Sequence, residues 1–313
     1  MSNYPNGIDG LVLKGIPIVQ SNPGRVVWVN GSSVPGIDGV LGADSSTKGS
    51  YHTPVATIDA AVALCTANRG DLIIVAPGHT ETVSAASGIT LDVAGIAVIG
   101  LGRGSLRPTI TLDTAATASV VISAASVTVA NCLFVAGFAD ITRIIDVTGT
   151  DATIHKCEFI ESGANLNWVD VIDASGADNT ADGLTVTECD AYAVDAACDS
   201  FIEITGDISR LTVEDCHVVH DHANATAFIE QATGKDMINV SIRRNHYDSL
   251  KASGDVLIDN DTTANSGIVA NNTCSHGDTT GEVLVDADGV ALIDNKGTGV
   301  ITASAYLLPA VDS

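Results

Sequence analysis

The segment Leu184-Thr185-Val186-Thr187-Glu188-Cys189 decides the fold of this 313-residue chain, because close variants of it recur along the second half. Each copy reads apolar, hydroxyl, apolar, two mostly polar residues, and then Cys or Asn. The copies end at Cys132, Cys157, Cys189, Cys216 and Asn245, and looser ones end at Asn272 and Asn295. Successive end points are 23 to 32 residues apart. A repeat of this length is typical of a solenoid, in which each unit contacts only its neighbours.

A second short pattern precedes each copy and places an acidic residue after two apolar ones, as in Ile144-Ile145-Asp146. The acidic positions are Asp146, Asp173, Glu203, Glu230, Asp259 and Asp286. They are 27 to 30 residues apart, so two independent columns share nearly one period. Each repeat therefore contains at least two short strands, separated by Gly, Asn, Asp and Ser.

Side-chain alternation assigns each column to a face. Leu184 and Val186 mark the core face, and Thr185 and its equivalents point outward as a hydroxyl ladder. The Cys/Asn column falls at a turn, where Asn can hydrogen-bond to the next copy and Cys packs as a small apolar residue. In the other strand, Ile145 and its equivalents point inward, so the acidic residues point outward.

We predict an all-β, right-handed parallel β-helix with an N-terminal capping helix and a short N-terminal arm. The period is too short for βαβ units with a full helix in each copy. An antiparallel sandwich would need hairpin turns every ~8–12 residues and would not explain columns in register.

The charge of the chain excludes several partners. It has 14 Lys and Arg against 38 Asp and Glu, a formal net charge of −24. Nucleic acid is not an expected partner, because neutralising phosphate needs a basic face. We expect no membrane partner, because no apolar run of roughly 18 residues occurs. The N-terminus predicts no secretion signal.

The seven cysteines indicate packing rather than disulfides, since four lie in the turn column. None has the Cys-x-x-Cys spacing of a zinc site. We therefore expect folding in a reducing cytoplasm, no metal and no cofactor.

Three segments are expected along the chain. Residues 51–300 form the β-helix and residues 301–313 form a tail that closes the last coil. The pair Thr53-Pro54 predicts the start of a capping helix over residues 54–68, which would cover the open end of the first coil. Residues 1–50 read as an arm that either anchors the protein to a partner or folds over the solenoid end. The candidate anchor residues are Trp28, Val26, Ile8 and Ile37.

The chain resembles the pectin-lyase-like β-helix proteins of tailed bacteriophages over about residues 50 to 300. The residues that carry this resemblance are the helix Ala56–Ala61, the strand and turn Gly70–Gly78, and Val98–Gly102. Related β-helices serve as tailspikes, fibres and capsid decorations. The resemblance implies a virion protein that assembles as a homotrimer.

The acidic column is the sharpest candidate binding site. Coils stack about 4.8 Å apart, and two carboxylates at that distance repel by about 0.9 kcal/mol in water. Five such contacts would cost roughly 4 kcal/mol before salt screening. The simplest reading is a solvated acidic face with splayed side chains. A bound cation, a basic partner surface, or carboxylates with a raised pKa for catalysis would also offset the repulsion.

Two weaker candidates lie nearby. Trp168, just before Asp170 and Asp173, is the best hint of a sugar platform, although carboxylate spacing alone is unspecific here. In the run His217–His222, the side chains of His220 and His222 would share a face and could bind a metal, but a polar loop is the favoured reading. The fragments His276-Gly277 and Asp178-Asn179-Thr180 match lyase and polygalacturonase motifs too poorly to carry a catalytic role.

We therefore expect a non-enzymatic capsid decoration (cement) protein on the virion surface, synthesised in the host cytoplasm and bound to the major capsid protein and to itself. The shortness of the chain and its 4% aromatic content favour this reading over an enzyme. The alternative is a tailspike or host-adhesion protein that binds or depolymerises surface polysaccharide. A cellular lyase would require a secretion signal.

Overall fold

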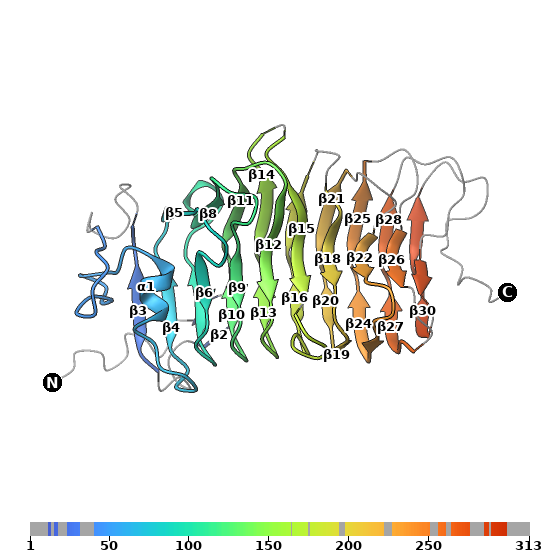
Figure 1. The fold of residues 1–313 in the computed structure, drawn as a ribbon, viewed down its shortest axis with the longest axis horizontal. Coiled ribbons are helices and arrows are strands. Elements are labelled where there is room, and N and C mark those ends of the chain that lie inside the picture. The colour runs from blue at the N-terminus through green and yellow to red at the C-terminus, as the bar shows by residue number, and fades with distance from the viewer. Residues whose placement is uncertain are drawn as a thin grey trace.

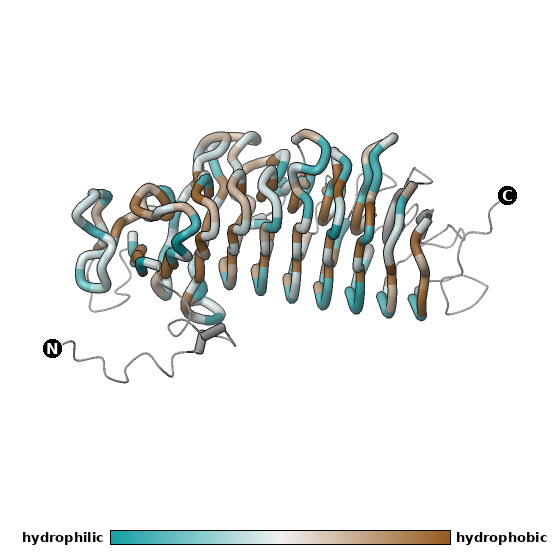
Figure 2. Tube along the Cα trace, turned by 90° about the horizontal axis from the view of Figure 1, so that it is seen from below, coloured by the Kyte–Doolittle hydropathy of each residue, from teal (hydrophilic) through white to brown (hydrophobic). Residues whose placement is uncertain are grey.

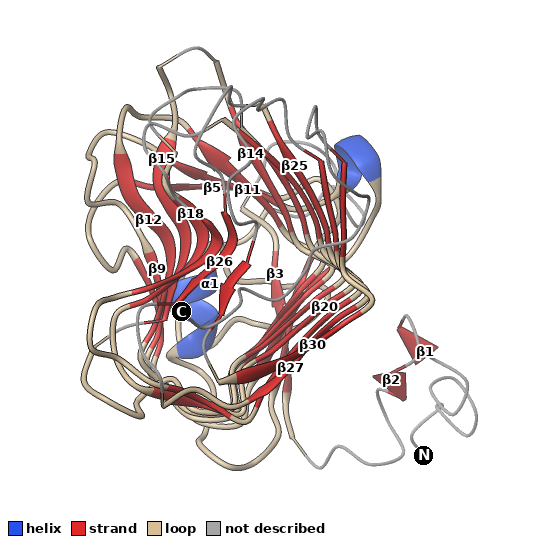
Figure 3. Ribbon diagram, turned by 90° about the vertical axis from the view of Figure 1, so that its right-hand side faces the viewer, coloured by secondary structure: helices blue, strands red, loops and turns tan. Residues whose placement is uncertain are grey.

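The computed structural model is a parallel β-helix, which confirms the predicted fold class. Strands stack along the long axis of the molecule (Figure 1), and an end-on view shows them as sheets around a common interior (Figure 3). The structure describes residues 12–13, 16–17, 24–31, 41–163, 165–174, 176–193, 198–221, 227–250, 256–260, 264–275, 285–287 and 289–298.

Three long parallel sheets form the body. The ten-stranded sheet contains β3 (Val26–Val29), β4 (Leu72–Val75), β7 (Ala97–Gly100), β10 (Thr128–Ala130), β13 (Thr153–His155), β16 (Thr185–Thr187), β20 (Thr212–Glu214), β24 (Val240–Arg243), β27 (Gly267–Ala270) and β30 (Val290–Ile293). The nine-stranded sheet contains β5 (Thr80–Val83), β8 (Thr109–Leu112), β11 (Leu133–Ala136), β14 (Glu158–Glu161), β17 (Asp190–Tyr192), β21 (His217–His220), β25 (His246–Ser249), β28 (Thr273–Ser275) and β31 (Lys296–Thr298). The eight-stranded sheet contains β6 (Ile89–Leu91), β9 (Val120–Ile122), β12 (Ile141–Val147), β15 (Trp168–Ala174), β18 (Ser200–Ile204), β22 (Ala227–Gln231), β26 (Val256–Asn260) and β29 (Val285–Ala287).

The remaining elements are short. The strands β19 (Ile208–Ser209) and β23 (Met237–Ile238) pair in parallel, and β1 (Val12–Leu13) pairs antiparallel with β2 (Ile16–Pro17). One helix, α1 (Ile58–Val62), and a 3-10 turn (Gly104–Leu106) complete the described elements.

The predicted columns are rows of residues in register across the coils. Thr185 pairs with Thr153 on one side and with Thr212 on the other, and all three side chains face outward and are half-buried. Val186 belongs to the adjacent, inward row, and it and its register partners Ile154 and Val213 are fully buried. Polar and apolar segments alternate around each coil in Figure 2. The two-residue period of the strands therefore sorts the sequence into core and surface.

The Cys/Asn column lies at the turn from the ten-stranded to the nine-stranded sheet. The preceding residue has a left-handed backbone, as at Glu188 (φ 51°) and Asp215 (φ 56°). A left-handed residue that is not glycine costs about 1 kcal/mol or more. The hydrogen bonds made by the next residue offset this cost.

Three asparagines in this column form a buried ladder. Asn245 Nδ2 donates to Asn272 Oδ1 at 3.0 Å, and Asn272 Nδ2 donates to Asn295 Oδ1 at 2.9 Å. Each amide also donates to a main-chain carbonyl of the preceding coil, as Asn272 does to Ile242 O at 3.0 Å. Each carbonyl accepts from the main chain of the coil before it. The ladder thus satisfies polar groups that a buried turn would otherwise leave unpaired.

The cysteines take the same place in earlier coils. Cys189 Sγ donates to Ile154 O at 3.7 Å and Cys216 Sγ donates to Val186 O at 3.7 Å, the carbonyls equivalent to those that the asparagines use. All seven cysteines are free, and burial raises the pKa of the Cys132 and Cys189 thiols. The predicted packing role of this column is confirmed.

The N-terminal end differs from the prediction in two ways. The helix is α1, five residues long rather than residues 54–68, and Thr57 is its N-cap, with a side chain that accepts from Ala60 N at 3.2 Å. Val55 forms a parallel bridge with Val29, which keeps the preceding residues extended. The strand β3 pairs in parallel with β4, so residues 26–29 belong to the solenoid rather than to a separate arm.

Replacing Asn272 with Ala tests the asparagine ladder. The change leaves Asn245 N and the Ile242 carbonyl without their buried partners. We expect the free energy of unfolding to fall by at least about 2 kcal/mol. Urea denaturation followed by circular dichroism measures it. The matched control is Asn271→Gly at the exposed left-handed neighbour (φ 57°), which keeps every buried bond. Equal stability of Asn272→Ala and wild type would contradict this role.

Candidate functional site

The predicted acidic column is in register on the eight-stranded sheet. Its six members pair in sequence order across β12, β15, β18, β22, β26 and β29. The side chains of Asp259 and Asp286 lie outside the described residues. The other four members are not uniformly solvated: Asp146, Glu203 and Glu230 are half-buried, and Asp173 is buried, 3% exposed. The simplest reading, a solvated row, is wrong at Asp173.

Arg143 neutralises the first part of the column. Its Nη1 forms ion pairs with Asp173 Oδ2 and, at 3.6 Å, with Asp146 Oδ2. Asp173 also accepts a hydrogen bond from Thr205 Oγ1 at 3.3 Å. Arg143 lies in β12, three residues before Asp146, and its guanidinium bridges two coils. One cation therefore offsets the repulsion of the first two carboxylates.

A proton on Asp170, in the same strand as Asp173, reduces the repulsion between β15 and β18. Asp170 is 6% exposed and accepts from Ser200 Oγ at 2.8 Å. Burial, followed by the charge of Glu203 and a hydrogen bond to it, raises the pKa of Asp170 to about 9. At neutral pH Asp170 is therefore a carboxylic acid that donates its proton to Glu203. Such a pair has one negative charge where two carboxylates would repel each other.

A raised pKa is also a property of catalytic acids. A glycosidase acid must reach the oxygen of the leaving group. The Asp170 proton is instead engaged by Glu203, and the side chain is covered. The sequence analysis named Asp170 only as a neighbour of Trp168 and did not assign it a role of its own.

Trp168 is not a sugar platform, and that interpretation is wrong. It is fully buried, and its Nε1 donates to the Nε2 of His220, which is also fully buried, at 3.2 Å. The register pairs Trp168 with Ile141, an apolar residue of the core. His220 therefore points inward and does not share an outer metal site with His222, which lies outside the described residues.

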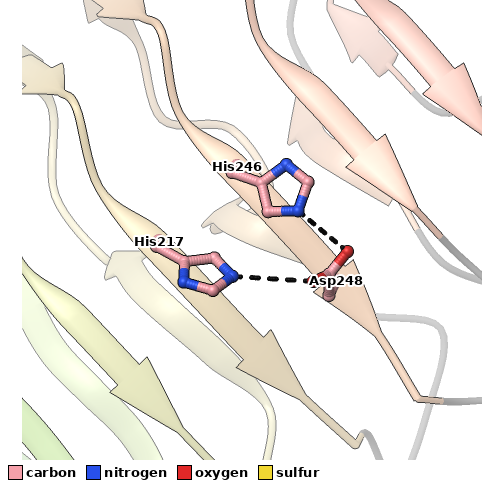
Figure 4. A group of neighbouring side chains, drawn as sticks. All are labelled: His217, His246 and Asp248. Carbon is pink, nitrogen blue, oxygen red and sulfur yellow. Dashed lines mark ion pairs between the residues drawn. The ribbon is translucent and has the colours of Figure 1, made fainter.

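A different group of side chains meets on the outer face of the nine-stranded sheet. His217 in β21 and His246 and Asp248 in β25 have ligand atoms within 4.8 Å of one another (Figure 4). Asp248 pairs with His246 Nε2 at 3.1 Å and with His217 Nε2 at 3.5 Å. The sequence analysis missed this cluster. The available signal was the step of 29 residues that takes Cys216 to Asn245 and also takes His217 to His246.

The third candidate is an apolar cluster on the outer face of the ten-stranded sheet. Leu72, Ile74 and Ile99 are its buried members. The partly buried residues packed against them are Trp28, Ala97 and Leu101. Val26, beside Leu72, is 41% exposed. Two of the four predicted anchor residues, Trp28 and Val26, thus lie at this cluster, and Ile8 and Ile37 lie outside the described residues.

No protein-family model, no curated protein and no solved structure matches this chain. In the part of the chain that the structure describes, no helix has the length and apolar character to cross a membrane. The fold defines the class, a parallel β-helix protein. Three groups of side chains on its outer faces are candidate functional sites: an acidic row, a His–His–Asp cluster and an apolar cluster.

Replacing Asp170 with Asn tests the shared proton. Between about pH 4 and pH 9 the folded protein keeps on Asp170 a proton that the unfolded chain has already released. The resulting contribution to the free energy of unfolding is therefore full below about pH 4 and is lost as the pH rises to 9. The amide of Asp170→Asn retains the hydrogen bonds without titrating. In the variant we expect the free energy of unfolding to fall less steeply with rising pH, by up to about 1.4 kcal/mol per pH unit.

Urea unfolding at pH 5.5 and pH 8 measures this slope. Asp190→Asn, at an exposed position on another sheet, is the control and should keep the wild-type slope. An unchanged slope in Asp170→Asn would show that the proton is not held there.

Replacing Asp173 with Asn tests the pairing with Arg143. Because Asp173 is buried against Arg143 and Thr205, we expect the melting temperature to fall, with a loss of about 1–3 kcal/mol. Asp146→Asn, at the more exposed partner, should cost less than about 1 kcal/mol. Differential scanning calorimetry compares the two. A rise in melting temperature would mean that repulsion along the acidic column dominates.

Proposed function

We propose that this chain is a non-enzymatic structural protein of a tailed-phage virion, a decoration protein that attaches to the major capsid protein and stabilises the shell. The observation that carries the proposal is the apolar cluster outside β3, β4 and β7. The sequence resemblance to phage β-helix proteins supports the viral setting and extends the proposal to a homotrimer.

The apolar cluster is a local exception to the surface pattern of its sheet. In one outward row, Val26 and Leu72 are followed in register by Ala97 and then by Thr128, where the hydroxyl ladder begins. A solenoid gains nothing for its core from apolar residues on the outer face. Three members of the cluster are covered, so the part that a partner can reach consists of Val26 and the half-buried Trp28, Ala97 and Leu101. Apolar side chains gathered in this way at one end of a polar surface are typical of a protein contact.

The rest of the molecule suits attachment by this end. In-register sheets form a rigid body, and the net charge of −24 keeps copies soluble and apart until a specific contact holds them. The large aromatic side chains of the described coils are mostly internal, as the stacked rings of Phe134 and Phe159 are. A rigid acidic body with one apolar attachment surface matches the needs of a decoration protein.

The second candidate is a tailspike or host-adhesion protein that cleaves polysaccharide. Asp170 and Glu203 are two neighbouring carboxyl groups of the kind that such an enzyme uses, but the burial of Asp170 counts against this function. Release of reducing ends from host capsular polysaccharide by the purified protein, and its loss in Asp170→Asn, would favour this function over decoration.

Antibody labelling of intact virions, viewed by electron microscopy, tests the location. We expect label over the head. Label confined to the tail tip would overturn the decoration role.

Attachment itself is tested by Val26→Lys, which places a charge in the apolar cluster at a side chain that is 41% exposed and hence tolerant of change. We expect at least about a tenfold loss of affinity for capsids that lack the protein, measured by co-sedimentation, because burying an unpaired charge is costly. Tyr192→Lys, at a 54% exposed side chain on another sheet, is the matched control. Equal binding by both variants would place the contact elsewhere.

A further inference from the structure

The outer face of the nine-stranded sheet presents two adjacent rows of side chains. In the first row Asp190, His217, His246 and Thr273 lie in register on consecutive coils. In the second row, Asp248 follows Val219 in register. His246 and Asp248 are two residues apart in β25, so they share the outer face, and His217 joins them from the preceding coil. Strand geometry alone thus brings two imidazoles and one carboxylate together.

We propose that His217, His246 and Asp248 form a binding site for a divalent transition-metal ion of the zinc and nickel class. Imidazole nitrogens with a carboxylate oxygen are ligands that suit these ions, whereas calcium and magnesium prefer oxygen alone. This site is independent of the capsid attachment proposed above, because it lies on a different sheet.

The spacing of the ligand atoms fits a coordination polyhedron. Ligands about 2.0–2.1 Å from a tetrahedral ion lie roughly 3.4 Å from one another. Asp248 Oδ1 lies 3.1 Å from His246 Nε2, and Asp248 Oδ2 lies 3.5 Å from His217 Nε2. All three ligand atoms lie within 4.8 Å of one another, so small side-chain rotations close the site around an ion.

A neighbouring coil orients one ligand. His246 Nδ1 lies 2.5 Å from Thr273 Oγ1 in β28. When Nδ1 carries the proton and donates it to this hydroxyl, Nε2 keeps its lone pair and faces Asp248. Histidine ligands in metal sites are commonly fixed by such a bond at the other ring nitrogen. Thr273 is therefore a positioning residue.

The exposure of these side chains and the charge around them also suit the binding of a cation. The side chains of His217, His246 and Asp248 are 49%, 47% and 32% exposed, so water can complete the coordination shell. Asp190 precedes His217 in the row and adds negative charge to the approach. Because β21 and β25 belong to consecutive coils, a bound ion would link these coils and stabilise the C-terminal half of the solenoid.

The test is isothermal titration calorimetry of the full chain with NiCl₂, in a Cys65→Ser background that removes the one cysteine thiol that is not buried. We expect one ion per chain and a rise in melting temperature on addition of the metal. His217→Ala, His246→Ala and Asp248→Asn should each weaken binding at least about tenfold and reduce the thermal shift. Thr273→Val should weaken binding less than loss of a ligand does.

The matched control is His52→Ala, an exposed histidine at the N-terminal end of the solenoid and several coils from β21 and β25, which should bind as the parent does. Circular dichroism of each variant without metal checks that the fold is intact, and all three ligand positions are exposed enough for substitution. Absence of saturable binding to the parent protein would overturn the proposal. Unchanged binding by the triple variant His217→Ala, His246→Ala, Asp248→Asn would do so as well.

Discussion

The structure depends on the parallel, in-register hydrogen bonding of one coil to the next. Each inner strand of the three long sheets hydrogen-bonds to a strand on either side, and the same bonding pattern recurs from coil to coil, as when Thr185 N donates to Ala152 O and Thr212 N donates to Leu184 O. Backbone satisfaction therefore requires that every residue stack on its equivalent about 4.8 Å away. Equivalent positions in successive coils have similar surroundings, so a residue type that is favourable at one of them is favourable at all, and the cost of an unfavourable one is repeated in every coil.

Inside the coils this constraint is favourable. Rows of Val, Ile and Phe fill a continuous core, and stacked rings such as Phe201 and Phe228, with centroids 5.3 Å apart, extend it along the axis. The turn column needs small residues that can bond across coils. Asparagine does so with two strong hydrogen bonds, and cysteine does so with a weak thiol donor. Both residues donate to a main-chain carbonyl of the preceding coil at a turn where the residue before them is left-handed.

Outside the coils the same constraint is unfavourable for charge, because like residues are forced together. The acidic column shows two remedies. Arg143 bridges Asp146 and Asp173, and a retained proton on Asp170 lets it donate to Glu203. On the nine-stranded sheet, the carboxylate of Asp248 lies between two imidazoles. The candidate binding surfaces lie on the outer faces, because the side chains of the inner faces and of the turn column are buried in the packed interior.

The sequence by itself determined the period, the inward and outward rows and the Cys/Asn turn, because a two-residue alternation repeated in every coil has only one parallel, in-register arrangement. It also located Trp28 and Val26, although their sharing of an apolar surface with Ile74 depends on pairing between β3 and β4. Only the tertiary structure decided which rows become neighbours and how far each side chain is covered. Trp168 reads as surface beside two acids, yet the register with Ile141 places it in the core. His217 and His246 meet because adjacent coils bring together residues that are far apart along the chain, and the reach of Arg143 and the proton on Asp170 follow from burial that no periodicity encodes.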